Sequence, residues 1–78
     1  MLKGKVRIES ISKEDTRRIV RLVPQNDETI AQESRIWGRE VPGPFEVNLI
    51  ASPEVNSLVV GSDFYLELTP ARKGAAAG

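Results

Sequence analysis

Apolar and polar residues alternate most regularly near the end of the chain. Phe64, Leu66 and Leu68 occupy every second position, and Tyr, Glu and Thr fill the positions that follow them. A period of two is typical of a strand that buries one face. Gly61 begins a tight turn before this run because glycine tolerates positive φ, and Pro70 ends it. The segment therefore predicts a β-strand with one apolar face.

Three earlier segments show the same alternation, at residues 3–11, 17–23 and 45–50. The second of them carries apolar residues on both faces, which predicts a central strand or a strand that is covered on both faces. The polar turn at residues 12–15 predicts that the first two segments form an antiparallel hairpin. The expected core combines one face of each segment: Val6, Ile8, Val20, Leu22, Phe45, Val47, Leu49, Phe64, Leu66 and Leu68.

The intervening segments consist mostly of turn residues. Residues 29–39 are ambiguous, because Thr29 could cap a helix while the residues after Glu33 fit a short strand or an irregular segment. Ser52 followed by Pro53 predicts one helical turn, with the serine as N-cap and the proline at the first helical position. Together these patterns predict an all-β fold: an SH3-like or OB-like small barrel of about five antiparallel strands with one short helical turn.

This barrel is expected to form a single domain over residues 1–70, with residues 71–78 as a disordered tail. The chain has 78 residues, no cysteine and no histidine. Disulfides, thiolate zinc ligands and the commonest general base are therefore absent. We expect no catalytic residues, no cofactor and no metal, and hence no enzyme. No apolar run is long enough for a membrane span, and the N-terminus lacks the apolar stretch of a signal peptide, which favours an intracellular protein without a membrane partner.

The net charge is zero, but the charges are unevenly distributed. Residues 1–21 carry seven basic side chains and three acidic ones, whereas residues 22–71 carry two basic and eight acidic ones. One interpretation is a basic face that meets nucleic acid or an acidic partner. The interpretation we favour is that the basic strands lie beside acidic strands and pair with them. Zero net charge also argues against tight nonspecific DNA binding, which needs several neutralised phosphates.

Trp37 is the most conspicuous single side chain. With Arg35 and Arg39 on either side, it could stack on a nucleic-acid base, but a lone Trp in a small domain is more often a core residue or an interface anchor. Tyr65 shares a strand face with Asp63 and Glu67, and two carboxylates supply too few oxygens for calcium. We expect that face to be solvated. The candidate protein-interface residues are Ile36, Trp37, Pro42 and Pro44.

The order of segments resembles small uncharacterised proteins of tailed bacteriophages and prophages. The resemblance covers residues 30–71: a Pro-Gly turn at residues 41–44, an alternating strand, a Ser-Pro-Glu turn at residues 52–54, and an ending of the form Gly-x-x-(Phe/Tyr)-Tyr-x-x-(Leu/Phe)-x-Pro-Ala. Phe64 stands where the family commonly has its first tyrosine, and the Pro-Gly turn is altered. The resemblance implies a phage context and a virion-associated accessory role.

We therefore expect a phage virion accessory protein, most plausibly a head decoration or cement subunit that binds the major capsid protein. It would be found in the virion, and in the bacterial host cytoplasm during assembly, and it could form homo-oligomers on the lattice. Two alternatives stay open. One is a small nucleic-acid-binding barrel that uses the basic strands and Trp37, and the other is an adaptor or inhibitor that binds a host protein.

Overall fold

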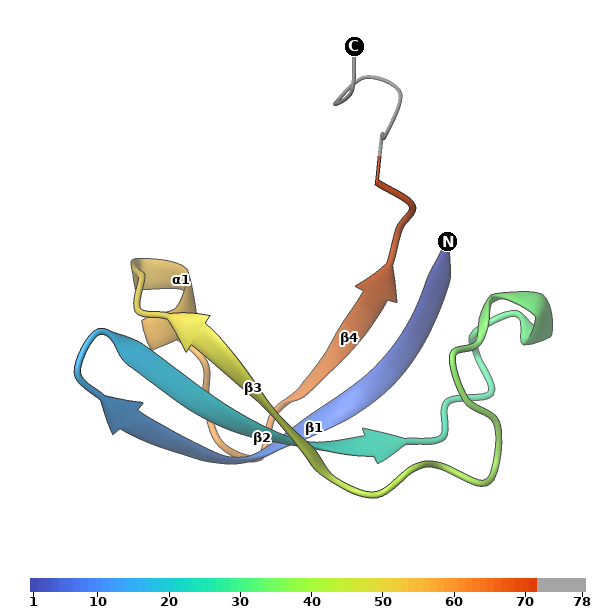
Figure 1. Cartoon of the computed structure of the whole chain (residues 1–78). Coiled ribbons are helices and arrows are strands. Elements are labelled where there is room, and N and C mark those ends of the chain that lie inside the picture. Colours follow the sequence, from blue (N-terminus) through green and yellow to red (C-terminus); the bar gives the residue numbers. More distant parts are fainter. Residues whose placement is uncertain (72–78) are drawn as a thin grey trace, which may run out of the picture.

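The computed structural model describes residues 1–71 as one curled antiparallel sheet with two short helical turns (Figure 1). The sheet elements are β1 (Leu2–Glu14), β2 (Arg17–Gln25), β3 (Phe45–Ile50) and β4 (Asp63–Leu68). A 3₁₀ turn covers Gln32–Ser34, and helix α1 covers Pro53–Asn56. Residues 72–78, where most of the disordered tail was predicted, lie outside the described part of the chain.

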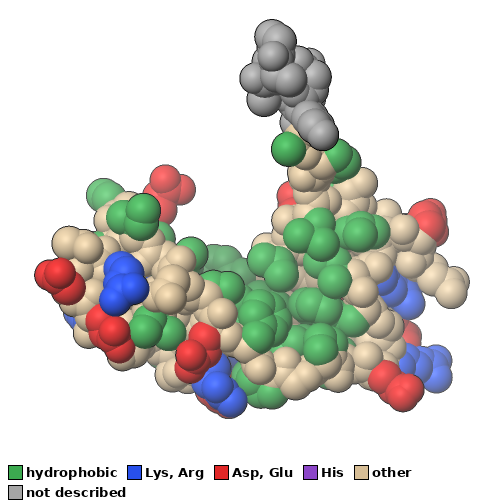
Figure 2. Space-filling model, in the orientation of Figure 1, with side chains coloured by type: hydrophobic (Ala, Val, Ile, Leu, Met, Phe, Trp, Pro, Cys, Tyr) green, Lys and Arg blue, Asp and Glu red, His purple; other side chains and the backbone are tan. Residues whose placement is uncertain are grey.

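The strands are arranged in the order β3-β2-β1-β4, and every neighbouring pair is antiparallel. This confirms the all-β prediction, with four strands where about five were expected. The sheet curls into a half-barrel with two rising arms (Figure 1), and the surface between the arms is hollowed (Figure 2). The ambiguous residues 29–39 add no further strand, because only Arg35 bridges to Lys3 of β1. β3 and β4 consequently form the two edges of the sheet.

The predicted hairpin between the first two strands is confirmed and contains a β-bulge. β1 and β2 are joined by a two-residue loop, and Asp15 in that loop has a φ of 55°. The pairing shifts between Ile8 and Ser10, so that β1 has one residue more than β2 at this point. A bulge of this kind bends its strand and increases the local twist, which contributes to the curl of the sheet.

The core lies on the concave face of the sheet, at the centre of β1 and β2. Among the described residues, the fully buried hydrophobic side chains are Val6, Ile8, Val20 and Leu22, all four of which were predicted. Phe45, Val47, Leu49 and Leu66 pack against them and are partly buried.

The prediction was wrong for two residues of β4, because Phe64 is 42% exposed and Leu68 is 51% exposed. Their side of the strand faces the concave hollow as alternation requires. They remain exposed because β4 is an edge strand and no described element lies over it.

The predicted helical turn is confirmed in detail. The Ser52 hydroxyl accepts a hydrogen bond from the Val55 backbone N–H at 3.1 Å, and Pro53 is the first helical residue. A helix beginning at Thr29 is not found. The 3₁₀ turn begins at Gln32 with Ala31 before it, and Thr29 instead donates hydrogen bonds to Asp27. The Asp27 carboxylate accepts from both the N–H and the hydroxyl of Thr29, so these local hydrogen bonds form a turn at this point in place of a helix N-terminus.

Candidate functional site: the concave face of the sheet

The two faces of the sheet differ in whether their side chains find ion-pair and hydrogen-bond partners within the chain. The convex face carries the alternate positions of each strand, and these are mostly charged. Its cations and anions lie opposite each other on neighbouring strands. The pairs are Lys3–Glu67, Lys5–Asp63, Arg7–Asp63, Arg21–Glu9 and Arg21–Glu46, with N–O distances of 2.6–3.7 Å. This confirms the interpretation in which the basic N-terminal strands pair with acidic neighbours across the sheet.

Asp63 is central to this face because it accepts from two strand-β1 residues. Arg7 Nε donates to its Oδ1 at 2.8 Å, and Lys5 Nζ lies 3.6 Å from its Oδ2. These contacts, the Arg7 hydrogen bond most of all, lower the pKa of the Asp63 carboxyl. The outer face of β4 is thus a cross-strand ion-pair ladder, where the sequence predicted only a solvated face for Tyr65, Asp63 and Glu67.

A second polar cluster clamps the loop after β2 onto the convex face. The Tyr65 hydroxyl donates to Asp27 Oδ2 at 2.8 Å, and Thr29 donates to Oδ1 of the same carboxylate through its N–H and its hydroxyl. The Thr29 hydroxyl, the Tyr65 hydroxyl and the Thr29 N–H together lower the pKa of Asp27 to about 2. The Lys3 ammonium lies 5.2 Å from the centre of the Tyr65 ring, within range of a cation–π contact.

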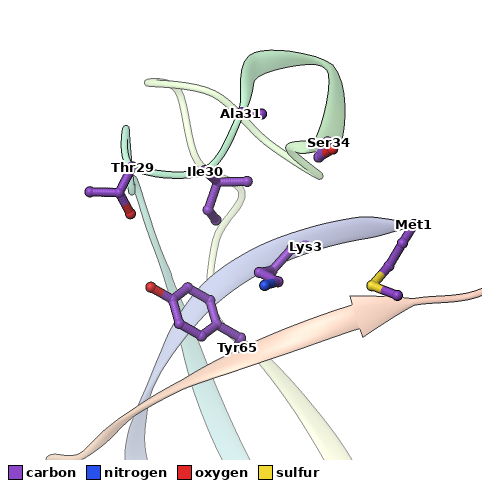
Figure 3. Close-up of a pocket in the computed structure, with 7 residues that line it drawn as sticks. All are labelled: Met1, Lys3, Thr29, Ile30, Ala31, Ser34 and Tyr65. Carbon is purple, nitrogen blue, oxygen red and sulfur yellow. The ribbon is translucent and has the colours of Figure 1, made fainter.

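This loop and strands β1 and β4 enclose a cavity of about 340 Å³ (Figure 3). The figure shows the Tyr65 ring beneath the loop that carries Thr29 and Ile30, with Lys3 beside it. Two of its polar side chains already have partners outside the lining: Tyr65 donates to Asp27, and Lys3 pairs with Glu67. We therefore assign this cavity a structural role, in which it fixes the loop to the sheet.

The concave face is apolar and open. A groove of about 220 Å³ follows its floor, and hydrophobic side chains gather in the hollow between the two arms of the molecule (Figure 2). The lining comes from all four strands and from the segment after α1: Val6, Ile8, Val20, Leu22, Val47, Leu49, Leu58, Phe64, Tyr65 and Leu66. The floor of the groove is thus the core of the domain itself, which Trp37 and Leu58 cover only in part.

The overall dimensions agree with a partly covered core. The radius of gyration is 14.4 Å, whereas a compact domain of this length is expected to have about 11 Å. The principal extents are 40 × 37 × 19 Å, so the molecule is broad and thin. A domain of this size buries a smaller fraction of the surface of its unfolded chain, about 60%, than larger domains do. A further layer on the concave face would supply the burial that the sheet alone does not.

The four predicted interface residues lie in the segment between the 3₁₀ turn and β3. Ile36 donates its backbone N–H to the Lys3 carbonyl at 3.0 Å, and Trp37 donates its indole N–H to the Gln25 carbonyl at 2.8 Å. Pro42 and Pro44 are exposed shortly before β3. None of the four lines the apolar groove. Their role in an interface remains a prediction.

Trp37 is partly buried by contacts within the chain. Its ring lies over Gly4 of β1, where a Cβ atom would come within 2.7 Å of the ring. Gly4 therefore has to be glycine for the indole to reach the Gln25 carbonyl. These contacts agree with the prediction that Trp37 is a core residue. They also leave its ring poorly placed to stack on a nucleic-acid base.

Sequence reasoning missed the groove because it assumed a closed barrel. It counted Lys13 and Arg18 among the basic residues that could meet an acidic partner, but it did not place them at one end of the concave face. One signal was available: Ile8 and Ile11 are separated by two residues, not one. That spacing breaks strict alternation, as expected where a bulge inserts one extra residue into a strand. With the bulge included, Ile11 and Lys13 move to the concave face, opposite Val20 and Arg18.

Residues 1–71 contain no group of three or more side chains that could hold a metal ion. Within the same residues, no helix has the length and apolar character needed to cross a membrane. Comparison with protein-family models, with curated proteins and with solved structures gives no match to this chain.

Proposed function

We propose that the protein is a non-enzymatic accessory protein of a phage virion, a decoration or cement subunit that binds the capsid through its concave face. The observation that carries this proposal is the uncovered apolar groove of the half-barrel. Contiguous apolar surface of this kind on a small protein is characteristic of protein–protein interfaces. The phage context and the capsid partner rest on the sequence resemblance over residues 30–71.

The arrangement of edges supports a protein partner. β3 and β4 each present one unpaired side, and they border the groove on opposite sides. Free strand edges beside an apolar floor can accept a partner's backbone and side chains together, as in β-strand addition. Pro44 before β3 and Pro70 after β4 limit how far pairing could extend along each edge.

Nucleic-acid binding is the less favoured candidate. Four of the seven basic side chains in residues 1–21 are already paired with carboxylates on the convex face. Trp37, the proposed stacking residue, lies over Gly4 and uses its indole N–H within the chain. These contacts reduce both the phosphate-binding charge and the aromatic platform that single-strand binding requires.

Quantitative mass spectrometry of purified virions tests the proposal. We expect many copies of the protein per particle of the phage that encodes it. Absence from the particles would overturn the virion assignment and favour an adaptor that binds a host protein.

A pair of variants tests the face that is used. Phe64 lines the groove and is 42% exposed, whereas Ile50 is 78% exposed on the convex face. Phe64→Ser should reduce the amount of protein retained on particles, and Ile50→Ser should leave it unchanged. Equal retention of the two variants would contradict docking through the concave face.

A further inference from the structure

The concave face changes from apolar to positively charged at the end nearest the β1–β2 loop. The bulge in β1 places Lys13 on the concave side, directly opposite Arg18 of β2, and Arg18 in turn lies opposite Leu49 of β3. Two cations therefore continue the same rows that carry Ile11 and Val20. The apolar floor of the groove is therefore bordered at this end by two positively charged side chains.

These cations line a cavity of about 460 Å³ between the hairpin and the segment around α1. Its other lining residues are Ile11, Val55, Asn56 and Leu58. Leu58 also lines the apolar groove, so the cavity and the groove adjoin one another. A single elongated ligand could occupy both.

The charges of this cavity are uncompensated within residues 1–71. Lys3, Lys5, Arg7, Arg21 and Arg39 each have a carboxylate oxygen within 4.0 Å, but Lys13 and Arg18 have none among the described residues. Arg18 Nη1 donates to the carbonyls of Arg17 and Asp15 at 2.9 and 3.3 Å. Its Nε is buried and has no acceptor in the described structure. The guanidinium is thus held in place, partly desolvated and unneutralised.

We infer that the concave face binds a protein segment with apolar side chains followed by a carboxylate, the apolar part in the groove and the carboxylate against Lys13 and Arg18. This inference rests on the proposed function, because it assumes that the concave face is the docking surface. Charge complementarity identifies the partner chemistry, since an anion in a partly desolvated site gains more than at an exposed one. Two cations beside an apolar floor do not supply the several phosphate contacts that nucleic acid needs.

Two fluorescent probes separate the two parts of the site. The dye 8-anilino-1-naphthalenesulfonate combines an apolar ring system with an anion, and N-phenyl-1-naphthylamine has the same ring system without the charge. Fluorescence titration of the wild-type protein should show both dyes binding, with the anionic dye bound several-fold more tightly. Near-ultraviolet circular dichroism from Trp37 verifies that each variant keeps its native packing.

Lys13→Met, Arg18→Met and the double variant remove the charges and keep most of the side-chain length. The double variant should bind the anionic dye about fivefold more weakly, or weaker still, and its affinity for the neutral dye should be unchanged. Lys13→Met alone serves if loss of the Arg18 hydrogen bonds unfolds the hairpin. Arg17→Met is the matched control, because it removes the same charge from the opposite face of β2 and should leave both dyes unaffected.

The outcomes distinguish this inference from the proposed function. If the anionic dye binds the double variant and Arg17→Met equally well, the carboxylate site is wrong while the apolar docking face stands. If neither dye binds the folded wild-type protein, the concave face is not accessible, as it would be when a second copy covers it, and both proposals fail.

Discussion

The convex and concave faces of this sheet are built from alternate residues of the same four strands, yet only one of them is complete. On the convex face, cations of β1 and β2 meet carboxylates of β1, β3 and β4, and the loop after β2 is clamped by Asp27 and Tyr65. On the concave face, buried residues at the centre give way to half-exposed apolar residues at the rim. The charged side chains of the convex face find their partners within the chain, whereas apolar side chains at the rim of the concave face stay exposed to solvent.

The difference shows how a very small domain can fold while part of its apolar face stays exposed. Four buried side chains at the centre of the long hairpin hold β1 and β2 together, while the edge strands contribute residues that are buried on one side only. A partner that covered these residues would add hydrophobic burial and stabilise the fold by mass action. The same residues would then serve folding and recognition.

The largest effect should come from truncation at the centre of the concave face. Ile8 is 2% exposed, so Ile8→Ala should lower the free energy of unfolding by about 2–5 kcal/mol. Phe64→Ala should cost clearly less although it removes a larger side chain, because Phe64 is partly exposed before the change. Urea unfolding followed by circular dichroism measures both. Equal losses would contradict the distinction between core and rim, and Ile50→Ala is the surface control.

Gly4→Ala should have the next largest effect. A Cβ atom at this position meets the Trp37 ring at 2.7 Å, and displacing the ring strains its bond to the Gln25 carbonyl. Overpacking of this kind costs about 1–3 kcal/mol. We expect a lower melting temperature and a shifted Trp fluorescence maximum. Gly38→Ala is the control because its Cβ would contact nothing within 4 Å, and an unchanged emission spectrum in Gly4→Ala would contradict the close packing.

Acid should weaken the convex face through its carboxylates. The pKa of Asp27 is about 2 in the folded chain against an ordinary 3.8, so the unfolded chain binds the proton more readily and protonation favours unfolding. This stabilising contribution is present above pH 4 and is lost as the pH falls towards 2. Asp63, whose pKa is also lowered, acts in the same direction.

Asp27→Asn should flatten the decline of the free energy of unfolding between pH 4 and pH 2. Tyr65→Phe should flatten it less, because Thr29 still donates to the carboxylate. Urea unfolding at a series of pH values measures the slopes. Glu33→Gln, a change at an exposed residue of the 3₁₀ turn, should retain the wild-type slope. If Asp27→Asn retains it as well, the clamp does not carry the acid sensitivity.

The smallest effect should come from single ion pairs of the convex face. Glu46→Gln removes a pair with Arg21 at 3.7 Å between side chains that are both well exposed. Exposed pairs contribute about 0.2–1 kcal/mol and are screened by salt. The difference from wild type should shrink in concentrated sodium chloride. A loss as large as that of Ile8→Ala would overturn the view that the concave face carries the stability.

Local patterns in the sequence predict much of this fold. Alternation identified all four strands and the four buried residues, and the Ser52-Pro53 pair identified the helical turn with its cap. Cross-strand charge pairing followed from the uneven charge distribution. These features depend on neighbours along the chain or directly across a hairpin, where periodicity and propensity decide the outcome.

The features that sequence reasoning missed depend on tertiary packing and on an irregularity within a strand. Alternation shows that Phe64 and Leu68 share one side of a strand, but burial also requires another element opposite them. The contact between Gly4 and Trp37 joins residues far apart in the chain, and no local pattern marks it. The cationic end of the concave face required the bulge, because strict alternation from Ile8 places Lys13 on the wrong side.

Because of the bulge, the number of residues in β1 affects how strongly the strand bends and therefore the shape of the groove. Removing Ser10 would restore regular alternation and leave Ile11 and Lys13 on the concave side, since one residue would then separate Ile8 from Ile11. Every side chain that faces the hollow would keep its direction while the bend that the extra residue imposes on β1 would relax. A one-residue deletion at this point should therefore widen the concave groove without altering the set of side chains that line it.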